Sequence, residues 1–154
     1  MVVNRAVSTV LDASLAVLLV SAAAVALVTI PGGDQRPPDP DAAARTVLAS
    51  TTTAEYQTAN GSERAVSGRV GTLLAHAAVA DDRSTHSRFA GAVEDAVADV
   101  LRDADGRIAV VAIAGDGRVR VGEQPPPGAS VAAVSYEAVA ENDSVDITVR
   151  TWSP

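Results

Sequence analysis

The feature that most constrains this chain is an uninterrupted apolar run near its start, Ala13 to Ile30. The run contains no charged residue, and its few polar residues are hydroxyl-bearing. As a helix it would be roughly 27 Å long, close to the hydrocarbon thickness of a bilayer. Pro31 and two glycines follow and end the run. We therefore expect residues 1–30 to form a leader and a transmembrane helix.

A cleaved secretory signal is the competing interpretation of this run. The small-x-small spacing of Ala24 and Ala26 suits a signal peptidase. However, the apolar region of a signal is usually only about 7–15 residues long. The single basic residue before the run, Arg5, and the acid Asp12 also fit a signal poorly. A retained anchor is therefore favoured.

The flanks of the run predict how the chain crosses the membrane. The N-terminal amine and Arg5 precede it, whereas Arg36 follows it among three aspartates. Positive charge favours the cytoplasmic side, and the N-terminal flank is short. We expect a single-pass protein of the cell membrane that contacts the bilayer through Ala13 to Ile30. Its N-terminus would be cytoplasmic and its C-terminal domain outside.

Asp12 is open to two interpretations. If the helix begins near Ala6, the carboxylate lies roughly 9 Å along its axis. An acid at that depth is costly, which makes it a functional candidate. Alternatively, the membrane begins after Asp12, and the carboxylate lies among the headgroups.

The stretch "RAVSTVLDASLAVLLVSAAAVALV" resembles the N-termini of archaeal type IV pilin-like proteins, in which a short basic leader precedes a long apolar helix. The resemblance implies processing between Arg5 and Ala6. It also implies that Asp12 is an assembly residue, pairing with the amine of a neighbouring subunit. Two features depart from the family pattern: Thr9 replaces its usual proline, and the acid is seventh rather than fifth in the processed chain.

The composition restricts the chemistry and the partners. The chain has no cysteine, which excludes disulfides, thiolate metal sites and cysteine nucleophiles. Its 12 basic residues are all arginine, and the net charge is −7. Such a surface repels phosphate backbones, so no nucleic-acid partner is expected. An acidic, lysine-free chain rich in alanine and valine resembles proteins of salt-loving archaea, where salt screens like charges.

Residues 31–41 form a Pro/Gly/Asp-rich linker with four prolines. Such a sequence favours an extended stalk of roughly 3 Å per residue. The remaining residues, 42–154, are enough for one extracytoplasmic domain with its own core. Residues 45–59 are rich in Val, Thr and Tyr, which predicts a strand. Helical spacing of apolar residues predicts a helix over 62–81 and an amphipathic helix over 85–104.

The C-terminal part reads as strands joined by turns. Asp116-Gly117 and Asn142-Asp143 are the turn signals. Strands are expected at 108–113, 119–121, 131–139 and 145–151. We therefore expect an α+β fold, with two helices packed on a four- or five-stranded, mainly antiparallel sheet.

"VGEQPPPGASVAAVSY", residues 121–136, resembles uncharacterised haloarchaeal membrane proteins encoded with pilus- or secretion-type machinery. The resemblance implies a non-enzymatic structural or accessory subunit of such an assembly, with other membrane or pilus-like subunits as partners. The alternative is a membrane-tethered binding module with no assembly role. Helix association in the membrane, through Asp12, would separate the two.

Few residues suggest a chemical site. His76 and His86, with Asp81 and Asp82, could ligate a divalent ion, but their spacing fixes no geometry. No Gly-x-Ser-x-Gly motif or nucleotide-binding loop occurs, so we expect no enzyme activity, metal or cofactor.

Two asparagines satisfy the N-glycosylation sequon, each within a predicted turn. They are Asn60, before Gly-Ser, and Asn142, before Asp-Ser. An exported protein could carry a glycan at both.

Overall fold

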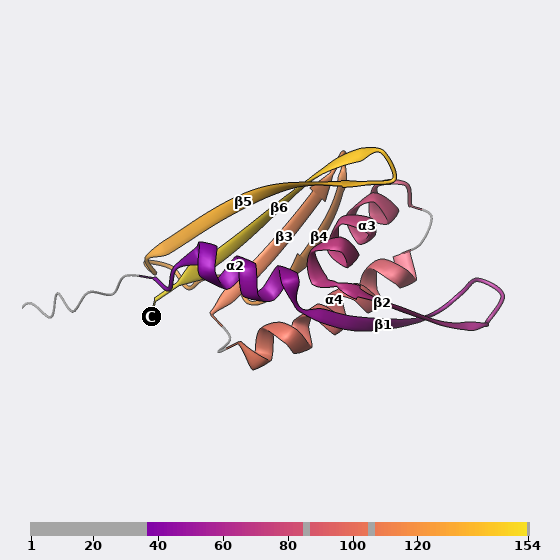
Figure 1. Cartoon of the computed structure of the whole chain (residues 1–154), viewed down its shortest axis with the longest axis horizontal. Helices are drawn as coiled ribbons and strands as arrows, with labels where there is room; N and C mark the ends of the chain where they lie inside the picture. The colour runs from indigo at the N-terminus through magenta and orange to yellow at the C-terminus, as the bar shows by residue number, and fades with distance from the viewer. Residues whose placement is uncertain (1–36, 85–86, 105–106, 154) are drawn as a thin grey trace, which may run out of the picture. The chain divides into compact units, whose positions relative to one another are not determined.

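The computed structural model describes residues 37–84, 87–104 and 107–153, which form an α+β fold (Figure 1). The elements, in chain order, are α2 (Pro40–Ala49), β1 (Thr51–Gln57), β2 (Glu63–Arg69), α3 (Val70–Asp82), α4 (Ser87–Asp103), β3 (Ile108–Ala114), β4 (Gly117–Val121), β5 (Val131–Ala140) and β6 (Asp143–Trp152). The predicted α+β class is confirmed, but the described residues form three helices instead of two, and their strands form two antiparallel sheets. Arg5, Ala6, Asp12 and the apolar run lie outside the described residues. Within the described part, no helix is long and apolar enough to cross a bilayer.

The main sheet has four antiparallel strands in the order β4-β3-β6-β5. Two tight hairpins build it, and β3 and β6 pair in the middle. The β3–β4 loop is Gly115-Asp116 and the β5–β6 loop is Glu141-Asn142, so each turn lies one residue before the predicted position. Glu141 and Asn142 both have positive φ, 52° and 76°, as a type I′ hairpin requires.

The prediction of one strand over 45–59 is correct for residues 51–57, which form β1, and wrong for residues 45–49, which are helical. Asp39 caps α2 by accepting a hydrogen bond from the backbone N–H of Asp41 at 3.0 Å. Pro40 follows at the first helical position, where a missing N–H costs nothing. Ala44 and Val47 are three residues apart and both buried. A proline that suggested an extended stalk therefore starts a helix.

The prediction of one helix over 62–81 is likewise correct only from residue 70 onward. Residues Glu63–Arg69 form β2, which pairs antiparallel with β1 in a separate two-stranded ribbon. The helix α3 begins only at Val70, directly after Arg69 in extended conformation. Val66 matched the helical spacing by chance, since it lies on the ribbon, half-buried. The Asn60-Gly61 turn, with Gly61 at φ 81°, joins two strands.

The described helices lie on one face of the main sheet (Figure 1). The core between them includes Val110, Val119 and Val149 from the sheet. The amphipathic helix expected at 85–104 is confirmed as α4, which buries Val93 and Val97. α4 also lies against β1, and the rings of Tyr56 and Phe89 meet edge to face at 5.3 Å. Seven residues of α3 are buried, because α3 is covered by α2, α4 and the sheet.

Candidate functional site: a groove beside an open strand edge

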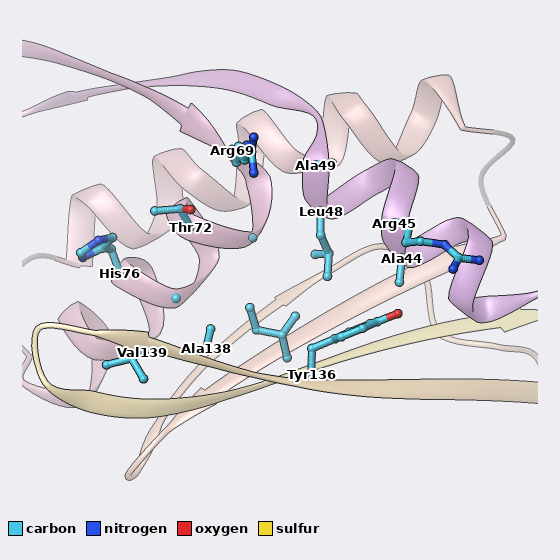
Figure 2. A pocket seen from close by; sticks show the side chains of 13 residues that line it. Ala44, Arg45, Leu48, Ala49, Arg69, Thr72, His76, Tyr136, Ala138 and Val139 are labelled. Atoms are coloured by element: carbon cyan, nitrogen blue, oxygen red, sulfur yellow. The ribbon is translucent and has the colours of Figure 1, made fainter.

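A groove of about 420 Å³ lies between α2, α3 and β5 (Figure 2). Leu48 of α2, Ala75 of α3 and Ala138 of β5 contribute apolar walls. The groove persists because many lining residues are small and cannot fill it. The start of α3 lies close to the end of α2, since a Cβ at Gly71 would be in van der Waals contact with Leu48, 3.4 Å from its carbonyl oxygen. The groove is therefore apolar, and its size is set by the spacing of the backbones that line it.

Polar side chains stand at the two ends of the groove. At one end, the Tyr136 hydroxyl donates to Asp41 Oδ1 at 2.6 Å, and Arg45 lies 3.8 Å from the same carboxylate. The hydrogen bond to Asp41 raises the pKa of Tyr136. At the other end, half-exposed His76 places Nδ1 3.8 Å from a carboxylate oxygen of Glu141. Arg69 and Thr72 lie along the rim contributed by β2 and α3 (Figure 2).

An ion-pair cluster holds the β5–β6 turn against the end of α3. Arg83 donates to a carboxylate oxygen of Glu141 and to Asp143 Oδ2, the latter at 2.7 Å. The hydrogen bond that Arg83 donates to Asp143 is the main cause that raises the pKa of Arg83. Arg83 bridges Glu141 in the β5–β6 loop and Asp143, which follows the loop, so it fixes that turn relative to α3. The His76 end of the groove is positioned by the same contacts.

The β4 edge of the main sheet is capped by carboxylates. In a hairpin with a two-residue loop, the residues flanking the loop bond to each other, and alternate residues bond across the strands. Ala114 and Gly117 flank the β3–β4 loop, so the N–H groups of Arg118 and Arg120 point away from β3. Asp81 of α3 accepts from Arg118 at 2.9 Å, and Glu94 of α4 accepts from Arg120 at 3.4 Å.

Asp82 extends this cap to the β3–β4 turn. Its Oδ1 accepts from the backbone N–H of Asp116 at 2.8 Å and of Gly117 at 3.3 Å. The neighbouring acids Asp81 and Asp82 thus hold hairpin backbone. His86, which the sequence groups with His76, Asp81 and Asp82 as candidate metal ligands, lies outside the described residues. Within the described ranges, no three His, Cys, Asp or Glu residues form a group that could hold a metal.

The β5 edge of the sheet is open. Ala140 and Asp143 flank the β5–β6 loop, so by the same alternation every second residue of β5 directs its N–H and C=O away from β6. These residues are Val131, Ala133, Ser135, Glu137 and Val139. Among the described residues, no strand pairs with this edge and no group bonds to these N–H and C=O groups.

The composition of this edge leaves it open to pairing. β5 contains no proline, lysine or arginine, the residues that commonly block an exposed edge. Val131 is 46% exposed and Val139 74% exposed. Sequence reasoning predicted the strand but not that it forms an edge. The usable signal was its ten residues with a single charge.

Both sequon asparagines lie in exposed hairpin loops. Asn60 is in the β1–β2 loop, where its Oδ1 accepts from the Ser62 backbone N–H at 3.2 Å. Asn142 is the second residue of the β5–β6 loop. Their predicted location in turns is confirmed, and glycosylation stays a prediction.

The fold and the site define a small α+β domain with a groove beside one open strand edge. The chain belongs to a family of unknown function, DUF7284, whose model matches residues 11–140. That range contains the apolar run as well as the segment from α2 to β5. No curated protein and no solved structure matches the chain.

Proposed function

We propose that the protein is a non-enzymatic, membrane-anchored subunit of a pilus-like or secretion-type surface assembly. Its extracytoplasmic domain works through contacts with other protein subunits. The open edge of β5 carries this proposal, because its row of unpaired N–H and C=O groups is a template for another polypeptide strand. At the opposite edge, Asp81 and Glu94 accept hydrogen bonds from the outward N–H groups of β4, so the main sheet has one capped edge and one open edge.

The apolar run, Ala13 to Ile30, supplies the anchor in this proposal. It is long enough for one membrane crossing, with the N-terminus cytoplasmic and the domain outside. The match of the family model to this run supports a role shared across the family. Asp12, directly before the run, is the residue we assign to subunit contacts within the membrane, after processing between Arg5 and Ala6.

A tethered binding module is the second candidate function, and the groove favours it. Its apolar walls and its polar ends at Tyr136 and His76 suit an amphipathic ligand. In this alternative the domain binds its ligand alone, and the anchor only holds it at the membrane.

The test is the composition and mass of the full-length protein extracted in mild detergent from membranes of its own organism. We expect wild type to extract as a complex with other membrane proteins, and Asp12→Ala to lose these partners. Ser14→Ala, a neutral change two residues away, is the matched control and should retain them. If wild type extracts without other proteins, and Asp12→Ala does not change its mass, the assembly role is wrong. N-terminal sequencing of the same sample tests processing before Ala6.

A further inference from the structure

We propose that the open edge of β5 pairs antiparallel with the same edge of a second copy, about a two-fold axis at Ser135. The two four-stranded sheets then form one continuous eight-stranded sheet. This inference deepens the proposed function, on which it rests, by naming one of its subunit contacts. We choose a second copy as the partner because the backbone groups, the exposed side chains and the charges of this edge are each complementary to those of the same edge turned by the two-fold axis.

The backbone groups of β5 are arranged symmetrically for self-pairing. The outward-facing residues run from Val131 to Val139 in steps of two, with Ser135 at their centre. An axis at Ser135 places Val131 opposite Val139 of the second copy, and Ala133 opposite Glu137. Every outward residue then faces another outward residue, which forms about ten main-chain hydrogen bonds. A shift of the axis in either direction shortens the paired segment.

The exposed side chains also complement each other in this register. Val139 and Val131 are the most exposed large apolar residues of the described chain, and the pairing places them side by side at both ends of the contact. An axis two residues further along would place the two Glu137 carboxylates directly opposite each other. The axis at Ser135 keeps them four residues apart along the strands, roughly 13 Å.

The charges on the open face of the sheet support the same partner. Within one copy, Glu137 lies directly opposite Asp146, a like-charge pair that destabilises a sheet. Arg150 lies in the row of Ala133. In the pair, Glu137 of the second copy therefore faces Arg150 across the small side chain of Ala133. Strands are about 4.8 Å apart, so the two long side chains can meet across one intervening strand.

The groove-facing side of β5 would be extended by the same contact. Val134 and Tyr136 are only half-buried, because the edge ends beside them. With the axis at Ser135, Val134 faces Tyr136 of the second copy, and the reverse holds for the symmetric pair. Self-pairing thus continues the apolar wall of each groove into the next molecule.

Disulfide trapping tests the pairing and its register on the full-length chain, which contains no native cysteine to interfere. Ser135→Cys places two thiols on the axis in a hydrogen-bonded pair, where Cα atoms about 5.5 Å apart suit a disulfide. Mild oxidation in native membranes should link it into a dimer. Ala133→Cys, on the same strand and face, is the matched control, and its two thiols would be too far apart. We expect about tenfold less dimer from the control. Coexpressed Ala133→Cys and Glu137→Cys chains should link to each other.

Ser135→Pro provides a second readout that does not depend on oxidation. It removes an outward N–H, and an edge strand tolerates proline where the N–H is not part of the ladder. We expect the number of copies of this chain in the detergent-extracted complex to fall from two to one by light scattering, with the far-ultraviolet circular dichroism of the protein unchanged.

The outcomes separate this inference from the proposed function. Equal linking of Ser135→Cys and Ala133→Cys, or an unchanged mass for Ser135→Pro, overturns the self-pairing. If complexes that depend on Asp12 persist in that case, the proposed function stands and another segment occupies the edge. Register-specific linking in a protein that extracts without other subunits supports the pairing and contradicts the assembly role.

Discussion

Gly117→Ala is expected to loosen the β3–β4 hairpin from α3. Gly117 begins β4 and is buried against the C-terminal turn of α3. A Cβ at this position would lie 2.3 Å from the Ala78 carbonyl oxygen and 2.3 Å from the Asp82 backbone nitrogen. Both contacts are with backbone, so no side-chain rotation can relieve them. The hairpin must move away, and its hydrogen bonds to the Asp82 carboxylate lengthen.

The magnitude follows from these two effects. Overpacking of this kind costs about 1–3 kcal/mol, and each weakened hydrogen bond costs about 1 kcal/mol. A total near 3 kcal/mol, in a compact unit that spans Gln35–Pro154, lowers the midpoint of thermal unfolding by about 12 °C. Circular dichroism of the full-length protein in detergent measures the midpoint.

Gly91→Ala is the matched control for this prediction. Gly91 lies inside α4, and a Cβ there would meet no heavy atom within 4 Å. Alanine in place of glycine within a helix stabilises by about 0.5–1 kcal/mol. The control should therefore raise the midpoint by a few degrees. If Gly117→Ala changes the midpoint no more than Gly91→Ala, the close approach of hairpin and helix is wrong.

Three further predictions concern the groove and the turns. The hydrogen bond to Asp41 raises the pKa of Tyr136. The stability that this bond contributes is therefore complete below the ordinary tyrosine pKa near 10 and is lost as pH rises through the raised pKa. Tyr136→Phe should abolish this alkaline dependence of the free energy of unfolding, measured with denaturant. Arg83→Gln should release the β5–β6 turn, seen as faster hydrogen exchange at residues 141–143 with little change elsewhere. Asn60→Gln and Asn142→Gln should each lower the intact mass of the native protein by one glycan, and an unmodified wild-type mass would contradict that prediction.

The sequence predicts best those elements whose spacing of apolar or turn residues reflects one local requirement. α4 packs one stripe against the rest, so the spacing of Val93 and Val97 was sufficient. The last four strands were also placed correctly, because their turns require glycine or asparagine in left-handed conformations, as at Gly115 and Asn142. A short local pattern determined each of these structures.

The errors occurred where local patterns conflicted with the structure around them. Pro40 fits both an extended stalk and the first turn of a helix, and the Asp39 cap with the packing of Ala44 and Val47 decides for the helix. The segment around Val66 fits both periodicities, and only pairing with β1 makes it a strand. The open edge of β5 could not be predicted from the sequence for a related reason. Which strand lies at an edge depends on the pairing order, which no single segment encodes.

The difference between the two sheet edges determines how far self-pairing can extend. If both edges were open, each added copy would present a new edge, and the sheet would grow into a fibre. Here Asp81 and Glu94 already satisfy the outward N–H groups of β4, so the eight-stranded sheet would end in two capped edges. Pairing through β5 is therefore closed at two copies. Any larger assembly must use other surfaces, and in the proposed function that surface is the apolar run that follows Asp12.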